Sequence, residues 1–279
     1  MDTIYTFEYL RSLFNEMAAS YDRVNYLTSF GFSHRFRRQF IEKAGLEEGF
    51  TVVDLMCGRG ECWPFILSGI GTAGKLLALD MSPGMLDGAR RRLTRCANGD
   101  ITVIEGNALS TGFEDASVDR VLVAFGLKTL AEEYRHGLAS ELYRVLRPGG
   151  IVSAIEMSEP RGWHLRPVFM WYLKSVVPIV GRLLLGNPSN YKMLGVYTER
   201  FQGCEPVVDA MRAAGFDADL VSYFHGCATG VVARKPVPEA VRSFVVAPGT
   251  GASEGLNKLS PQIGAGRVCP DPTDRIMVS

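Results

Sequence analysis

Short apolar runs that alternate with helical segments constrain the fold of this chain more than any other feature. The runs are rich in Val, Leu, Ile and Ala and span residues 51–56, 75–80, 101–105, 118–125 and 151–156. The segments between them carry apolar residues at helical spacing. Buried strands that alternate with helices are typical of a parallel sheet covered on both faces. We therefore expect a doubly wound, mostly parallel α/β fold of the Rossmann-like kind.

Helical patterns flank this core. Residues 1–50 are predicted to form an N-terminal helical segment, and residues 157–205 an apolar helical insertion. A helix over 207–214 and strands near 218–224 and 230–233 follow. These elements predict one domain over residues 1–236. Residues 237–279 are rich in Gly, Pro, Ser and Ala without periodicity, which predicts a disordered tail.

The insertion contains the longest apolar stretch, residues 165–185. This stretch is interrupted by Arg166, Pro167, Lys174, Pro178 and Arg182. A span of about 20 apolar residues is needed to cross a bilayer, and central charges are costly. We therefore expect no transmembrane helix, but an amphipathic helix pair that forms a lid over an apolar pocket. Contact with a membrane surface is the alternative.

Charge and cysteine content narrow the class of protein. The 279 residues include 30 basic and 30 acidic side chains, which argues against a nucleic-acid-binding protein. The six cysteines include no C-x-x-C pair, and the first residues lack the features of a secretory signal. We expect reduced thiols, no bound metal and a cytoplasmic protein. Peripheral membrane association and a homodimer are left open.

An acid and two glycines follow the first predicted strand, where residues 54–60 read Asp-Leu-Met-Cys-Gly-Arg-Gly. Glycines let a backbone approach a ligand closely, and ligands of doubly wound folds bind at the carboxyl ends of the strands. Trp63 stands where a dinucleotide fingerprint has its third glycine, and no Lys-Ser/Thr pair follows. The segment therefore fits neither NAD nor a P-loop.

Two further strand ends carry polar residues. Asp80 ends the second strand about 20 residues after the glycines, where a carboxylate can accept both hydroxyls of a ribose. A helix N-cap role is the alternative for Asp80. Asn107 follows the third strand, where its side chain can accept the exocyclic amine of an adenine. Together the three strand ends fit a nucleoside without phosphates, namely S-adenosylmethionine.

Three more segments carry a family resemblance: Tyr-Asp-Arg-Val-Asn at 21–25, Phe-Gly-Leu at 125–127, and Arg-Val-Leu-Arg-Pro-Gly-Gly at 144–150. Over about residues 12–236 the chain resembles the ubiquinone/menaquinone-biosynthesis C-methyltransferases, which are class I methyltransferases. The resemblance implies S-adenosylmethionine as cofactor and C-methylation of a lipophilic quinol or phenol. The cofactor-binding residues that we expect are Asp54, Cys57, Gly58, Gly60, Asp80, Met81, Asn107, Ala108 and Phe125.

The resemblance also bears on catalysis, because Tyr21 is implied to lie near the methyl-transfer site. A ring carbon becomes nucleophilic when a neighbouring hydroxyl ionises, so a base or cation near that oxygen matters. We expect Lys128 to stabilise the phenolate and Tyr21 to hydrogen-bond or relay the proton. Glu156 ends the fifth strand and could also act, with capping of backbone amides as its alternative.

Departures from the family pattern keep other functions open. The family usually has Arg-Asn where this chain has Lys128 and Thr129, and Tyr197 and Gln202 also depart from it. Lysine keeps the charge of arginine but loses its fork geometry. One alternative is a methyltransferase of the same fold that acts on O, N or C of a specialised metabolite. Another is a protein that binds S-adenosylmethionine without transferring its methyl group.

Overall fold

The computed structural model describes residues 2–29, 32–94, 96, 99–161, 164–183 and 187–238. Within these residues, seven strands form one sheet in the order β3-β2-β1-β4-β5-β7-β6. The strands are β1 (Thr51–Leu55), β2 (Lys75–Asp80), β3 (Asp100–Glu105), β4 (Val118–Ala124), β5 (Leu146–Met157), β6 (Asp217–Tyr223) and β7 (Ala228–Arg234). Six of these strands run in the same direction, and β7 runs opposite to them between β5 and β6. The expected doubly wound, mostly parallel sheet is confirmed, and its strand order reverses between β1 and β4.

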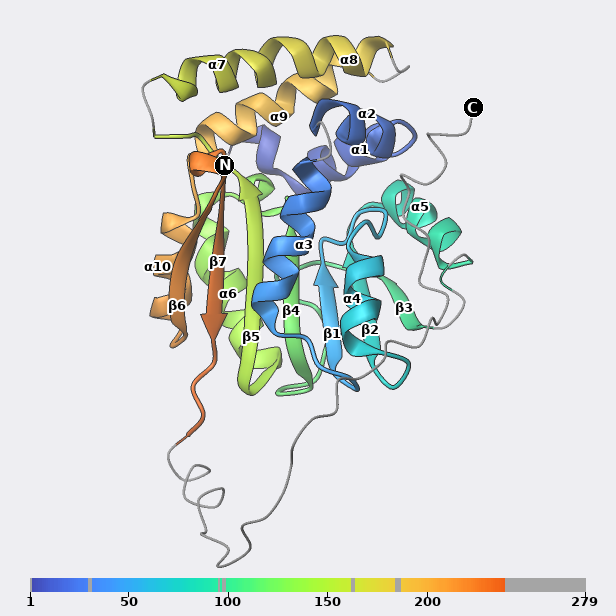
Figure 1. Cartoon of the computed structure of the whole chain (residues 1–279), viewed down its shortest axis with the longest axis vertical. Helices are drawn as coiled ribbons and strands as arrows, with labels where there is room; N and C mark the ends of the chain where they lie inside the picture. Colours follow the sequence, from blue (N-terminus) through green and yellow to red (C-terminus); the bar gives the residue numbers. More distant parts are fainter. Residues whose placement is uncertain are drawn as a thin grey trace, which may run out of the picture.

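Helices cover both faces of the sheet (Figure 1). One face carries α3 (Phe32–Ala44), α4 (Trp63–Ile70) and α5 (Pro83–Leu93), which bury Phe40, Trp63 and Leu86 against the strands. The other face carries α6 (Arg135–Val145) and α10 (Glu205–Ala213). Because each strand of the centre is covered on both sides, its side chains read as continuous apolar runs rather than as an alternation.

Local signals explain where α5 begins and ends. Ser82 caps the helix, since its hydroxyl accepts a hydrogen bond from the Met85 N–H at 3.2 Å, and Pro83 occupies the first turn. Arg90, Arg91 and Arg92 lie in the last turn, where cations favour the helix dipole. The basic run is therefore part of helix termination.

A third layer lies over the carboxyl edge of the sheet (Figure 1). We call it the lid, and it joins two segments that are far apart in the chain. Its elements are η1 (Thr3–Tyr5), α1 (Phe7–Met17), α2 (Tyr21–Ser29), α7 (Leu165–Trp171), η4 (Tyr172–Val176), α8 (Val177–Leu183) and α9 (Pro188–Phe201). The Tyr197 hydroxyl donates to the Ile4 carbonyl at 2.6 Å, and the hydroxyls of Ser20 and Tyr191 are 2.8 Å apart. The predicted lid thus includes the N-terminal helices as well as the insertion.

The outer helix of the lid is continuous from α7 to α8, with a π-helical turn at η4. Pro178 follows this turn and cannot donate a backbone hydrogen bond, which explains the local change of helix type. Among the described residues, no helix combines the length and the apolar character needed to span a bilayer.

Some expectations need correction. β5 begins at Leu146 rather than Ile151, because Leu146 pairs with Val118 and Gly149 donates to the Lys235 carbonyl at 2.9 Å. Cys57, Cys62, Cys204 and Cys227 are buried free thiols, as expected for reduced cysteines. The predicted tail lies outside the described residues from position 239 onward, and the domain boundary at 236 stays a prediction.

Candidate active site

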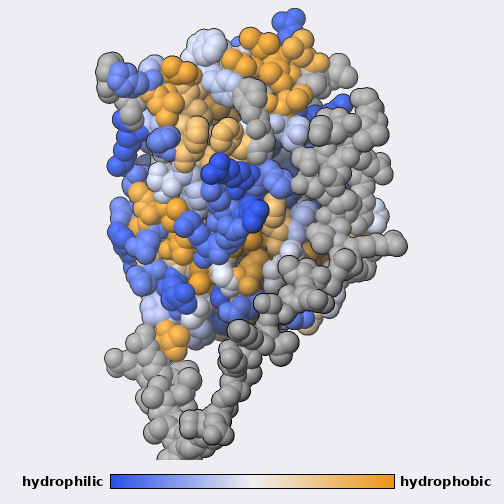
Figure 2. Space-filling model, in the orientation of Figure 1, coloured by the Kyte–Doolittle hydropathy of each residue, from blue (hydrophilic) through white to orange (hydrophobic). Residues whose placement is uncertain are grey.

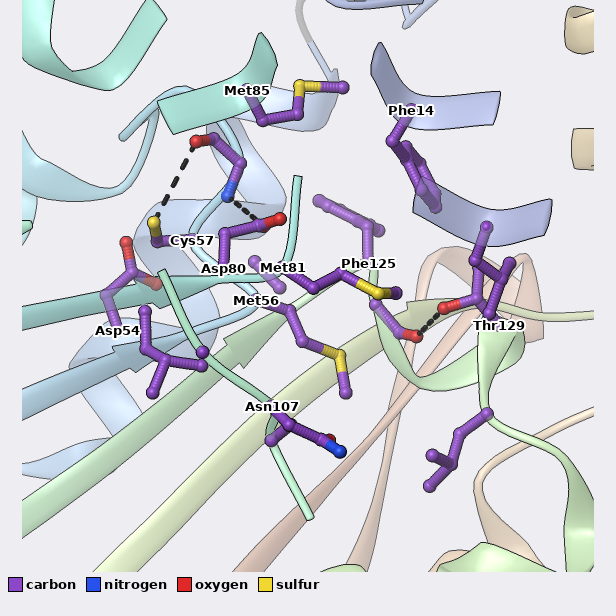
Figure 3. Close-up of a pocket in the computed structure, with 18 of the residues that line it drawn as sticks. Phe14, Asp54, Met56, Cys57, Asp80, Met81, Met85, Asn107, Phe125 and Thr129 are labelled. Carbon is purple, nitrogen blue, oxygen red and sulfur yellow. Dashed lines mark hydrogen bonds between the residues drawn. The ribbon is translucent and has the colours of Figure 1, made fainter. Parts of the chain in front are cut away.

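A cavity of about 350 Å³ opens at the carboxyl ends of β1, β2, β3 and β4 (Figure 3). Eight of the nine residues predicted to bind the cofactor line it, namely Asp54, Cys57, Gly58, Asp80, Met81, Asn107, Ala108 and Phe125. These residues come from four strand ends, so the tertiary structure brings together what the sequence separates. Gly60 is the predicted residue that does not line the cavity.

The glycine loop after β1 is held by the acid that ends β2. Asp80 Oδ2 accepts a hydrogen bond from the Gly58 N–H at 2.9 Å, and Oδ1 accepts one from the Ser82 N–H at 2.9 Å. Gly58 has φ +56°, a conformation that side chains rarely adopt. Burial raises the pKa of Asp80, although these backbone N–H groups oppose the shift. Asp80 therefore shapes the loop that lines the cavity and also lines the cavity itself.

At Gly60, both the backbone conformation and the closeness of a neighbouring side chain require glycine. Its φ is +79°, and a Cβ at this position would lie 2.6 Å from the Trp63 ring. Trp63 is fully buried against β1 and α3 as the first residue of α4. Gly60 therefore lets the loop pass over a core tryptophan.

The floor of the cavity holds two acids with unsatisfied oxygens. Asp54 Oδ2 and Glu61 Oε1 are buried and have no hydrogen-bond partner among the described residues. Burial, followed by the charge of Glu61, raises the pKa of Asp54 to about 8. Burial also raises the pKa of Glu61. Unpaired buried carboxyl oxygens are costly, so the site fits a ligand that brings a positive charge or hydrogen-bond donors.

Asn107 lies after β3, with its side chain partly committed to the local turn. Its Oδ1 accepts a hydrogen bond from the Leu109 N–H at 2.9 Å. A carbonyl oxygen has a second lone pair, and the amide nitrogen adds two donors. The side chain thus keeps hydrogen-bonding capacity on the cavity wall (Figure 3).

The sequence reasoning missed the roof of the cavity, which is helix α1 of the lid. Phe7, Leu10 and Phe14 line the cavity from this helix. Asn15 anchors α1, since its Oδ1 accepts from the Gly84 N–H at 2.9 Å. The spacing of Leu10, Phe14 and Met17 signals an apolar face, but nothing in the chain indicates which surface this face covers.

A salt bridge ties the lid to the glycine loop. Arg59 Nε donates to Asp22 Oδ2 at 2.9 Å, and its Nη1 donates to the Ala18 carbonyl. Arg92 of α5 donates to the Arg59 carbonyl at 2.8 Å. The residue between the two loop glycines therefore fixes the junction of α1 and α2.

A second cavity of about 300 Å³ lies between the sheet edge and the outer helix of the lid. Its wall is mostly apolar, with Phe32, Phe36, Met157, Phe169, Leu173, Val177, Leu194 and Phe224 among its lining residues. Tyr21, Arg37 and Phe125 line both cavities. Phe125 has φ +61°, and such strain in a non-glycine residue concentrates at functional sites.

The three residues predicted to be catalytic occupy different positions. Tyr21 lines both cavities, and Lys128 lines only the second. Glu156 lines neither cavity and is fully buried behind Lys128. Lys128 Nζ is 2.6 Å from Glu156 Oε1. Glu156 also accepts from the backbone N–H groups of Lys128 at 3.0 Å and Met157 at 2.7 Å. The capping of backbone amides that we expected as its alternative is therefore present.

The residues that depart from the family pattern lie partly at the two cavities and partly in the core of the lid. Thr129 lines the first cavity, and its hydroxyl donates to the Gly126 carbonyl at 2.7 Å. Tyr197 is fully buried in the lid and lines neither cavity. Lys128 and Thr198, which follows Tyr197 in the same departing segment, line the second cavity.

Comparison with known proteins identifies the family. The model of the ubiE/COQ5 methyltransferase family matches residues 3–236. The chain belongs to this family. It is 32% identical over 212 residues to a demethylmenaquinone methyltransferase of Lactococcus lactis, covering 76% of this chain and 83% of the relative. It is 31% identical over 208 residues to a protein of the same name from Lactiplantibacillus plantarum, covering 74% and 87%.

A solved structure supports the fold. A SAM-dependent methyltransferase from Aquifex aeolicus superposes with a TM-score of 0.51 at 22% identity, covering 71% of this chain and 88% of that chain. As a ubiE/COQ5 family member with this fold, the chain is a methyltransferase that uses S-adenosylmethionine. Within the described residues there is no group of three or more His, Cys, Asp or Glu side chains that could hold a metal ion.

Proposed function

We propose that the chain methylates a ring carbon of a lipophilic quinol, the kind of reaction for which demethylmenaquinone methyltransferases are named. The observation that carries this proposal is the common wall of Tyr21, Arg37 and Phe125 between a polar and an apolar cavity. Methyl transfer requires donor and acceptor to be held in line and shielded from water. Two adjoining cavities that meet at three side chains fit this requirement.

The first cavity has the chemistry that the cofactor needs. S-adenosylmethionine supplies an electrophilic methyl group when bound. The free oxygens of Asp54 and Glu61 fit its ammonium group, because they are buried without a partner among the described residues. Asp80 is the candidate for the ribose hydroxyls and Asn107 for the adenine.

The second cavity has the chemistry that the acceptor needs. Its apolar wall fits a lipophilic aromatic ring. Burial and the charge of Glu61 raise the pKa of Tyr21, so this side chain stays a phenol and acts as a hydrogen-bond donor rather than as a base. Lys128 brings a positive charge to the wall. Glu156 acts through Lys128 and is a positioning residue.

The direct test supplies purified protein with S-adenosylmethionine and a 2-prenyl-1,4-naphthoquinol kept reduced by dithionite. The expected product carries one additional methyl group on ring carbon 3, identified by mass spectrometry and NMR. A methyl group on oxygen would contradict C-methylation. Protein that binds S-adenosylmethionine but methylates neither this quinol nor simpler alkylphenols would leave cofactor binding without transfer as the function.

We further propose that the lid rests on a membrane surface. Four large apolar side chains of the outer helix are exposed: Val168 (62%), Trp171 (62%), Ile179 (59%) and Leu183 (75%). Apolar side chains gather over α7 and α8 in Figure 2. The opposite side of the same helix lines the second cavity. An apolar helix face with an exposed tryptophan and nearby basic residues suits the bilayer interface, which is also the source of a lipophilic quinol.

Vesicle flotation tests the membrane proposal with Trp171→Ser/Leu183→Ser against wild type. We expect wild-type protein to float with vesicles of phosphatidylglycerol and phosphatidylcholine, and the double variant to stay in solution. Leu220→Ser on β6 is the matched control, since Leu220 is an exposed apolar residue (41%) outside the lid. Wild-type protein that stays in solution and elutes as a dimer that the double variant abolishes would assign this face to a homodimer instead.

A further inference from the structure

Arg37 is a buried arginine that neither the motifs nor the roles proposed above explain. It lies on α3 within the segment Arg35-Phe36-Arg37-Arg38. Arg35 and Arg38 are exposed, whereas Arg37 is only 8% exposed. An arginine that is buried alone among its basic neighbours needs a local reason, because taking a guanidinium out of water is costly.

Its side chain reaches the junction of the two cavities. Arg37 lines both of them, and its guanidinium carbon lies 5.3 Å from the centre of the Phe125 ring. The Nε–H group is buried and has no hydrogen-bond partner among the described residues. Arg37 therefore brings a positive charge to the wall where the two cavities adjoin.

The surrounding charges keep this guanidinium ionised. Burial by itself lowers the pKa of Arg37, but the net shift is upward, chiefly because of Glu61. Asp22 is also engaged by Arg59, whose Nε lies 2.9 Å from its Oδ2. The cation thus has acidic neighbours without a hydrogen-bonded partner for its Nε–H.

The second cavity has two cationic side chains on its described wall, Arg37 and Lys128. Glu156 neutralises Lys128 at 2.6 Å, and Glu156 itself does not line the cavity. An anionic oxygen in this apolar cavity would therefore meet a matched ion pair at Lys128 and an unsatisfied donor at Arg37. A buried hydrogen bond to a charged partner is stronger than one between neutral groups.

We propose that Arg37 binds the ionised oxygen of the methyl acceptor at the junction of the two cavities. This inference rests on the proposed function and deepens it, because it names the group that recognises the phenolate. With the oxygen held by Arg37, the neighbouring ring carbon faces the first cavity. The lipophilic substituent extends along the apolar wall of the second cavity. Lys128 then acts on the bound oxygen through its electrostatic field rather than through direct contact.

The test measures ionisation of a bound phenol without any methyl transfer. 4-Nitro-1-naphthol, whose anion absorbs visible light, is titrated with pH in complex with the full chain and S-adenosylhomocysteine. We expect wild-type protein to lower the pKa of the bound probe, and Arg37→Gln to raise it by at least about one unit, which is tenfold in the acid dissociation constant. Arg38→Gln is the control on the same helix and should leave the titration unchanged.

Two further measurements keep the outcome decisive. Arg37→Lys retains the positive charge and replaces Arg37→Gln in the titration if Arg37→Gln does not fold. We expect Arg37→Lys to lower the pKa of the bound probe less than wild-type protein does. Calorimetry measures S-adenosylmethionine affinity of each variant. Weakened cofactor binding with an unchanged pKa of the probe would overturn the proposal and assign Arg37 to the cofactor carboxylate. An Arg37-dependent pKa of the probe in protein that methylates no quinol would overturn only the proposed function.

Discussion

Lys128 Nζ lies 2.6 Å from Glu156 Oε1, and the two side chains are 6% and 0% exposed. Glu156 also accepts hydrogen bonds from two backbone N–H groups, so the carboxylate is fully engaged. The pair joins the loop after β4 to the end of β5, directly under the second cavity. Its burial makes it a structural element as well as a candidate for catalysis.

Removing one member of this pair should destabilise the protein strongly. We expect Lys128→Met to lower the free energy of unfolding by about 3–5 kcal/mol, because an unpaired carboxylate remains buried. Lys128→Met/Glu156→Gln should recover part of the loss. Urea denaturation measures both. Arg38→Met, which breaks an exposed pair with Glu42 at 2.8 Å, is the control and should cost less than about 1 kcal/mol. Glu156→Gln alone completes the comparison, and a loss in the double variant equal to the sum of the two single losses would mean that the pair is not coupled.

Cofactor binding should release protons below pH 8. The pKa of Asp54 is about 8 in the unliganded protein, and an ammonium group beside it favours the carboxylate. Affinity for S-adenosylmethionine should therefore rise with pH up to about 8, where the α-amino group of the ligand itself loses its proton. Calorimetry at pH 7 in buffers of different ionisation enthalpy counts the protons. Asp54→Asn should reduce the number released, and an unchanged number would exclude Asp54 as the partner.

The same group makes the unliganded protein sensitive to pH. The folded-state pKa of Asp54 lies above its ordinary value of 3.8, so the folded protein binds the proton that the unfolded chain releases. Stability of the unliganded protein should accordingly fall as pH rises from about 4 to about 8. Asp54→Asn should flatten this dependence of the thermal midpoint. A midpoint in Asp54→Asn that falls as steeply as in wild type would contradict the assignment.

Gly60 should tolerate alanine worse than a glycine with similar backbone strain. Gly60→Ala adds a conformational cost of about 1–2 kcal/mol and a clash with the Trp63 ring worth about 1–3 kcal/mol. Gly112 has φ +72° and open space around its Cβ position, so Gly112→Ala should show the conformational cost alone. Chemical denaturation of the two variants isolates the Trp63 contact as their difference. Equal losses would show that the loop moves away from Trp63.

Loss of Arg59 should open the lid. The Arg59 guanidinium holds Asp22 and the Ala18 carbonyl, and charged hydrogen bonds contribute about 1.5–3 kcal/mol. Arg59→Met should therefore speed trypsin cleavage within α1 and α2 about tenfold or more, and raise the dissociation rate of S-adenosylmethionine. Arg90→Met removes an exposed pair with Asp87 and should change neither rate. Slow cleavage in Arg59→Met would show that packing alone closes the lid.

The sequence predicted the sheet and most of the residues that line the first cavity. Parallel strands buried on both faces require apolar runs, and glycine or polar residues at their carboxyl ends mark a binding edge. Asp54, Gly58, Asp80 and Asn107 could therefore be found from local pattern alone. The assignment of Gly60 to the cofactor stays a prediction, and the packing of the Trp63 ring gives this glycine a structural reason of its own.

Tertiary structure decided the parts of the site that depend on contacts between distant segments. The chain shows an apolar face on α1, but not that this face covers the first cavity at the sheet edge. It shows Arg37 within a basic run, where exposed side chains are the rule, and only the packing of α3 against the loops after β1 and β4 buries it. Lys128 and Glu156 are 28 residues apart and become a pair because β4 and β5 are neighbours in the sheet. The local pattern determines which elements form, whereas side-chain burial and ion pairing depend on which elements meet.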